Sequence, residues 1–244
     1  MGGVSYQFAM FYTGTQDPEG NGGRNSIGVA FATSLAGPWV KRTGALIERR
    51  AEESWGVGQP TATAIEGGRV LLAYTRSNPT RMYAQELDLS DAGSPIVRKA
   101  AWALSTQGIP DGLLCRGDMG FRPTDRRFYM VHDAKQSAPD PTWLSNTVFC
   151  SSIAEADFWD DQQTGSWTLH GTIDQETTGW VKNHNAGLVK NLYGMLLEPG
   201  VAEVPTSGTP CMTLHVHVSV AKCTAWPEAF WTYRLARVDV ALRH

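Results

Sequence analysis

The segment "GQPTATAIEGGRVLLAYTR" (Gly58–Arg76) carries the pattern that decides the fold: a polar head, a short strand, a tight turn and a second apolar strand. The same pattern returns in "GDMGFRPTDRRFYMVHDA" (Gly117–Ala134) and again in "HNAGLVKNLYGMLLEPG" (His184–Gly200). Helical periodicity is nearly absent between these segments, whereas short strand-like runs recur. Self-similarity at a regular spacing is the signature of a repeat architecture.

The spacing of the repeat predicts the size of its unit. The head residues are Gln59, Asp118 and Asn185, and 59 and then 67 residues separate them. Third and fourth strands accompany the pairs, as in "SIGVAFAT" followed by "WVKRTGALIE". A repeating four-stranded antiparallel unit of this length is typical of a β-propeller blade, which predicts an all-β, single-domain fold. The predicted blades of the domain 1–244 span approximately 1–50, 51–108, 109–175 and 176–244.

The first unit of the repeat is incomplete. Its run "YQFAMFYTG" matches the second strand of the later blades, with Thr13 at the place of Thr75 and Asp133. Stepping back one repeat from Gln59 reaches Met1, so we expect the first blade to lack its innermost strand. The sequence therefore predicts four blades, and a longer relative would have five.

Composition excludes several classes of protein. The chain has 244 residues, of which 42% are hydrophobic and 18% charged, as in globular domains rather than disordered chains. A net charge of -3 offers no basic surface for nucleic acid. No apolar run is long enough to span a membrane, and no signal peptide is visible at the N-terminus.

The four cysteines leave their pairing open. Cys211 and Cys223 could bridge two strand ends, and Cys115 and Cys150 could lie on neighbouring strands. Buried thiols without a bond fit the same spacings. No CxxC pair occurs, so a zinc or redox role has little support, and no metal site is predicted.

The segment "SIGVAFATSLAGPWVKRTGALIE" (Ser26–Glu48) resembles a recurring phrase of the five-bladed β-propeller glycoside hydrolases, the group of families 43, 62, 32, 68 and 117. In that phrase a third strand I-G-V-A-x-A-x-S is followed by G-P-W and a fourth strand. "FAMFYTG" before it and "GVGQPTATAIEGGRVLLAYT" after it fit the same pattern. The resemblance leaves the individual family open.

The resemblance implies cleavage of a glycosidic bond in a funnel at the propeller axis, lined by the heads of the innermost strands. It implies a carbohydrate partner, no required cofactor, an optional structural calcium ion in the central channel, and a secreted or periplasmic location. A propeller that lacks an inner strand could also recruit one from a second chain, so a homodimer is a further expectation.

The resemblance places catalysis on Asp118 and His184. Asp118 stands where the group has a second carboxylate, and His184 stands where family 43 has a glutamate general acid. Family 117 is similar in using a histidine acid, and an unperturbed histidine titrates near neutral pH. The alternatives are that Asp118 closes a turn, and that His184 and Asn185 bind sugar hydroxyls or cap the strand.

Four residues are candidates for substrate binding. The indole of Trp55 could stack on a sugar, and the amides of Gln59 and Asn185 could bind its hydroxyls. Arg116 could hold the carboxylate of Asp118 ionised. Ordinary packing, turn and surface roles account equally well for Trp55, Gln59 and Arg116.

The base or nucleophile of the group is an aspartate on the innermost strand of the first blade, which this chain does not visibly contain. Asp17 in "TQDPEG" is interpreted as a structural turn residue, and Glu52 and Glu53 as solvated rim residues. His215 and His217 have a metal-compatible spacing, but ordinary core or surface histidines are the favoured interpretation.

Three functions compete at this stage. The first is hydrolysis of a glycosidic bond in an oligo- or polysaccharide. The second is a carbohydrate-binding or degenerate propeller without catalysis. The third is a propeller that uses its funnel for non-hydrolytic chemistry on a small molecule. A second carboxyl group within glycosidase reach would favour the first of these.

Overall fold

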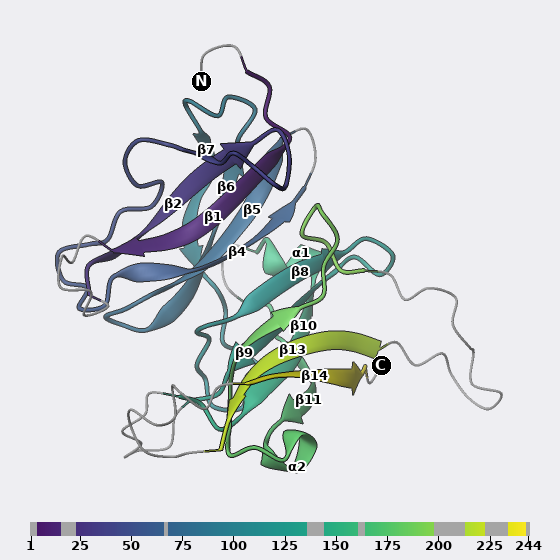
Figure 1. The fold of residues 1–244 in the computed structure, drawn as a ribbon. Coiled ribbons are helices and arrows are strands. Elements are labelled where there is room, and N and C mark those ends of the chain that lie inside the picture. The colour runs from purple at the N-terminus through teal and green to yellow at the C-terminus, as the bar shows by residue number, and fades with distance from the viewer. Residues whose placement is uncertain are drawn as a thin grey trace. The chain divides into compact units, whose positions relative to one another are not determined.

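The computed structural model is built almost entirely of antiparallel strands (Figure 1). It divides into two compact units, Met1–Leu104 and Ser105–His244, and each is described by itself. The residues that the structure describes are 4–15, 23–65, 68–135, 144–160, 164–197, 213–222 and 234–242.

The first unit contains two sheets whose strands follow one another in sequence. The three-stranded sheet is formed by β1 (Phe8–Thr15), β2 (Asn25–Ala32) and β3 (Val40–Lys41). The four-stranded sheet is formed by β4 (Val57–Ala64), β5 (Arg69–Arg76), β6 (Arg81–Asp88) and β7 (Ile96–Ala103).

The second unit repeats this arrangement with a four-stranded and a three-stranded sheet. The first contains β8 (Asp118–Arg122), β9 (Arg127–Asp133), β10 (Val148–Ala154) and β11 (Thr168–Ile173). The second contains β12 (Lys182–Leu188), β13 (Thr213–Ala221) and β14 (Arg234–Ala241). The described part of this unit also contains two one-turn helices, α1 (Glu155–Phe158) and α2 (Gln175–Thr178).

Each sheet is a simple meander, which is the topology of a propeller blade. The predicted all-β class and its four-stranded antiparallel units are confirmed. In the first sheet β1 lies at the edge and pairs only with β2 among the described residues. This position matches the expectation that an inner strand is missing there.

The third copy of the repeat pairs differently from the sequence prediction. The sequence indicated that "LYGMLLEPG" would supply the strand next to the head segment. Instead β12 pairs with β13, and Lys190 and Leu196 form only an isolated bridge. The sequence motif was misleading because a tight turn after Asn191 mimics the hairpins of the first two copies.

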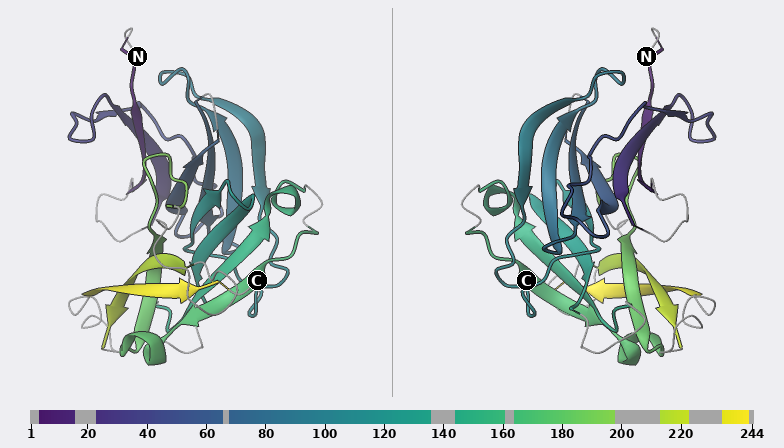
Figure 2. Two further views of the ribbon diagram at one scale, coloured as in Figure 1. Left: turned by 90° about the vertical axis from the view of Figure 1, so that its right-hand side faces the viewer. Right: turned by 90° about the vertical axis from the view of Figure 1, so that its left-hand side faces the viewer.

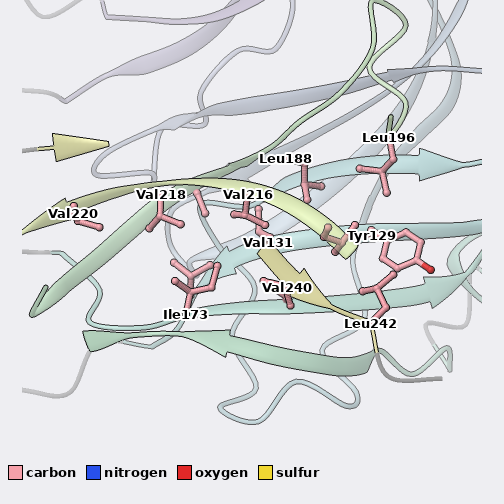
Figure 3. Close-up of a cluster of buried hydrophobic side chains, with 14 residues drawn as sticks. Tyr129, Val131, Ile173, Leu188, Leu196, Val216, Val218, Val220, Val240 and Leu242 are labelled. Atoms are coloured by element: carbon pink, nitrogen blue, oxygen red, sulfur yellow. The ribbon is translucent and has the colours of Figure 1, made fainter. Parts of the chain in front are cut away.

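The core of the second unit lies between its two sheets (Figure 3). Apolar residues at alternate positions of β13 face this core, whereas His215 and His217 alternate with them and point away. Figure 2 shows the twist of the sheets and β14, in yellow, at the C-terminal end. The buried members of the core include Tyr129, Val131, Ile173, Leu188, Val216, Val218 and Val220.

Other sequence predictions have clear outcomes. Cys115 and Cys150 are both buried and unbonded, so a disulfide between them is excluded. Cys211, Cys223 and Asp17 lie outside the described residues. Within the described parts of the chain, no helix has the length and apolar character needed to cross a bilayer.

Candidate functional site

The heads of the inner strands share an unusual backbone conformation. A β-bulge interrupts β4 around Gln59 and β12 around Asn185, and these residues have φ of 54° and 46°. Arg116, just before β8, has φ of 51°. Left-handed backbone is uncommon in residues other than glycine, and such strain gathers at functional sites. The three heads are therefore equivalent positions of the repeat; Asn185 is exposed, whereas Gln59 and Arg116 are half-buried.

Asp118 is the first residue of β8, but it lacks the left-handed backbone of Gln59 and Asn185. The left-handed position that Gln59 and Asn185 occupy is taken by Arg116, and Asp118 lies two residues further along. There it begins β8 and is paired with Val131 of β9. The repeat was aligned on Asp118 instead of Arg116, two residues too far along the chain, because "GDM" resembles "GQP" more than "CRG" does.

The carboxylate of Asp118 reaches across to the neighbouring inner strand. Oδ1 lies 2.5 Å from Nζ of Lys190, and Oδ2 accepts a hydrogen bond of 2.8 Å from the N–H of Leu188. A Cβ atom on Gly187 would lie 3.7 Å from Oδ2, so β12 passes close to this carboxylate. Asp118 forms an ion pair with Lys190, and Arg116 forms one with a different carboxylate.

That carboxylate belongs to Asp133, at the end of β9, which the sequence analysis did not assign to the site. Its Oδ1 accepts a hydrogen bond of 2.9 Å from the N–H of Asn185, and its Oδ2 lies 3.5 Å from Nη1 of Arg116. Burial raises the pKa of Asp133 to about 7, although Arg116 acts in the opposite direction. The only sequence signal was its repeat position, shared with Thr13.

His184 is buried beside the same arginine. Burial lowers its pKa to about 4, and the positive charges of Arg116 and Lys182 lower the pKa further in the same direction. The imidazole is therefore neutral near pH 7. It can donate or accept a hydrogen bond, but it carries no extra proton for general acid catalysis at that pH.

Trp55 and Gln59 lie together in the first unit. The N–H of Gln59 donates a hydrogen bond of 2.9 Å to Oγ1 of Thr13. A Cβ atom on Gly58 would lie 2.9 Å from Cη2 of Trp55, so the half-buried indole covers the strand beside Gln59. The indole of Trp55 therefore lies against the residue before Gln59, and a binding role for the two side chains stays a prediction.

Glu53 differs from its predicted place at a solvated rim. It is 3% exposed, and its carboxylate lies 2.9 Å from Nη1 of Arg76. It also accepts a hydrogen bond of 2.7 Å from the N–H of Arg50. The prediction was wrong because a charged residue was assigned to solvent without its partner, which lies on the following hairpin.

The structure therefore groups Arg116, Asp133, His184 and Asn185, with Asp118 attached through Gly187 and Leu188. Trp55 and Gln59 form a separate group in the other unit. Among the described residues, no cluster of three acidic, histidine or cysteine side chains could hold a metal ion. His215, which had a metal-compatible spacing with His217, instead pairs with Asp239, with Nδ1 of His215 2.7 Å from Oδ1 of Asp239.

Comparison with solved structures places this geometry in a known fold. The chain is similar to a thermostable family-43 glycoside hydrolase, with a TM-score of 0.52 and 15% identity over 97% of this chain and 68% of that one. It is also similar to the Bombyx mori GH32 beta-fructofuranosidase BmSUC1, with a TM-score of 0.50 and 9% identity over 94% of this chain and 44% of that one.

The fold is that of the five-bladed β-propeller glycoside hydrolases. The resemblance stated from the sequence is thereby confirmed for the fold, and the chain spans less than half of the Bombyx mori enzyme. No protein-family model and no curated protein matches the sequence.

Proposed function

We propose that this protein is a glycoside hydrolase-like enzyme that cleaves a glycosidic bond in an oligo- or polysaccharide. One observation carries the proposal. Asp118 at the start of β8 accepts a hydrogen bond from Leu188 of β12, and Asp133 joins Arg116 to Asn185, the neighbour of His184, in a fold shared with two glycoside hydrolases.

The chemistry available at these residues suits a sugar. The carboxylate of Asp118 supplies the acidic group, held in place by Lys190 and by the N–H of Leu188. The guanidinium of Arg116 and the amide of Asn185 offer donors for hydroxyl oxygens. The neutral imidazole of His184 suits substrate orientation better than proton donation near pH 7, which changes the role that the sequence suggested.

Within the first unit, Trp55 and Gln59 are a separate candidate for contact with sugar. An indole presents a flat apolar face of the kind that stacks on sugar rings, and an amide binds hydroxyl groups. The half-buried position of Trp55 leaves part of its ring open to a ligand.

The proposal is tested by release of reducing sugar from a panel of arabinans, fructans and nitrophenyl glycosides. We expect Asp118→Asn to reduce turnover at least a hundredfold and His184→Ala to raise KM more than it lowers kcat. Asp91→Asn is the matched control, because Asp91 only orders a surface turn in the first unit. Turnover that neither site substitution lowers would contradict the assignment.

A non-catalytic carbohydrate-binding propeller is the second candidate. Two observations favour it. Asp118, assigned to catalysis, is ion-paired with Lys190, and the pKa of His184 is too low for a general acid near pH 7. Calorimetric titration separates the two functions. Sugar binding that Asn185→Ala weakens, without any product from the wild type, would identify the binding protein.

A further inference from the structure

In each unit a backbone-to-side-chain hydrogen bond of the same type, the joint, links two consecutive blades. In the first unit Oγ1 of Thr13 accepts a hydrogen bond of 2.9 Å from the N–H of Gln59. In the second unit Oδ1 of Asp133 accepts a hydrogen bond of 2.9 Å from the N–H of Asn185. Both donors are left-handed residues in the bulge of an inner strand, and both acceptors are on the second strand of the preceding blade.

Thr13 shows that a neutral hydroxyl is sufficient for this joint. Asp133 performs the same task with a carboxyl group that is 0% exposed, and burial of a charge destabilises a protein. The raised pKa of Asp133 is the sign of that cost. Asp133 destabilises the folded protein more than a threonine would at the same position. We therefore expect a second role of Asp133 besides the joint.

The second oxygen of Asp133 indicates what that role is. Oδ2 accepts no hydrogen bond within the described residues, and it lies 3.5 Å from Nη1 of Arg116. The side chain of Asp133 is 1% exposed and that of Arg116 is 32% exposed. The carboxyl group of the pair is therefore buried, whereas the guanidinium is partly open to solvent. The exposed Asn185 contacts the same carboxyl group.

We propose that Asp133 is a positioning residue that fixes the guanidinium of Arg116 for contact with a sugar bound at the heads of β8 and β12. This inference rests on the proposed function for its ligand. A guanidinium has five donors in a rigid plane, so its orientation decides whether it can bind two sugar oxygens at once. Asp133 itself does not touch the ligand, because it is buried.

Thr13 of the first unit indicates which substitution at Asp133 tests this role. Asp133→Thr introduces the residue that the first unit uses, which keeps an acceptor for the N–H of Asn185 and removes the oxygen beside Arg116. Asp133→Asn keeps the shape of the side chain without the charge, and it serves if the threonine variant does not fold. Circular dichroism and cooperative urea unfolding establish that each variant is folded.

We expect both variants to raise KM, or the sugar dissociation constant, about tenfold or more, which is the loss of one charge-assisted hydrogen bond, with a smaller change in kcat. In an Arg116→Met background, Asp133→Thr should have no further effect on KM. A purely structural role would give the same loss in both backgrounds. An unchanged KM in folded Asp133→Thr, or an equal loss in both backgrounds, would overturn the inference.

A second experiment tests the role of Asp133 without any sugar, so that failure of the proposed function can be told apart from failure of this inference. If the wild type neither hydrolyses nor binds any sugar, the inference is judged by phenylglyoxal modification of Arg116, followed by peptide mass spectrometry. Release of the guanidinium in Asp133→Thr should raise its modification rate severalfold. An unchanged rate would show that Asp133 does not hold Arg116.

Discussion

Nζ of Lys190 lies 2.5 Å from Oδ1 of Asp118, and it also donates a hydrogen bond of 3.3 Å to the carbonyl of Met119. The two charged side chains are 18% and 19% exposed, so water screens the pair only in part. Lys190 follows β12 and Asp118 begins β8, so the pair joins two inner strands that are not adjacent in sequence.

Lys190→Met should lower the free energy of unfolding by about 1–3 kcal/mol, because it removes the cation beside the Asp118 carboxylate, which keeps its hydrogen bond from the N–H of Leu188. Urea unfolding measures the change. Adding Asp118→Asn should recover part of the loss, because it removes the negative charge that Lys190 balances. Wild-type stability in Lys190→Met would show that the pair contributes nothing.

Glu53→Ala should destabilise the first unit by about 3–5 kcal/mol, because the guanidinium of Arg76 loses its carboxylate in a site where both side chains are under 10% exposed. The neighbouring substitution Glu52→Ala is the matched control. Glu52 is exposed and contributes its backbone carbonyl to Asn78, so this change should cost under about 0.5 kcal/mol. Equal effects from both substitutions would refute the buried pair.

The stability of Asp133→Asn relative to the wild type should rise between pH 4 and pH 7. The pKa of Asp133 is about 7 in the folded protein and near 4 in the unfolded chain, so the folded state binds the extra proton in this window. The wild type therefore loses stability as the pH rises, and the asparagine variant lacks this loss.

His132 and His184 act in the opposite direction, because burial lowers the pKa of each to about 4. Their contribution increases wild-type stability as the pH rises towards 6.5, and it is present in both proteins. The difference between the two unfolding curves cancels it and should change by about 1 kcal/mol or more. A difference that does not vary with pH would contradict the raised pKa.

Cys115 and Cys150 should resist iodoacetamide at pH 8 in the folded protein. Burial raises the pKa of each thiol to about 12, so the reactive thiolate is nearly absent. Peptide mass spectrometry should show their modification only after addition of denaturant. Rapid labelling of either residue in the native state would show that its site is open to solvent.

The sequence predicted the repeat and the strands well, because both depend on local patterns. Alternation along β13 and the apolar run of β5 follow from which side chains a strand buries on each face. Pairing after Asn185 was predicted wrongly, because the partner strand follows a long connection whose length no local pattern reveals.

The site was predicted less completely. Asp118, His184 and Asn185 were proposed because they stand at or near strand heads, and Arg116 because it precedes one; their roles stay predictions. Asp133 was missed, because its importance depends on contacts with β8 and β12 that sequence spacing does not encode.

The sequence by itself determined that this chain folds into meandering antiparallel blades, since repeated turns and alternating apolar residues act over a few positions. Only the tertiary structure decided the state of the polar groups. Which carboxylate pairs with Lys190 and which with Arg116, and how far burial moves the pKa of Asp133 and His184, depend on dielectric surroundings and on distances between strands far apart in the chain.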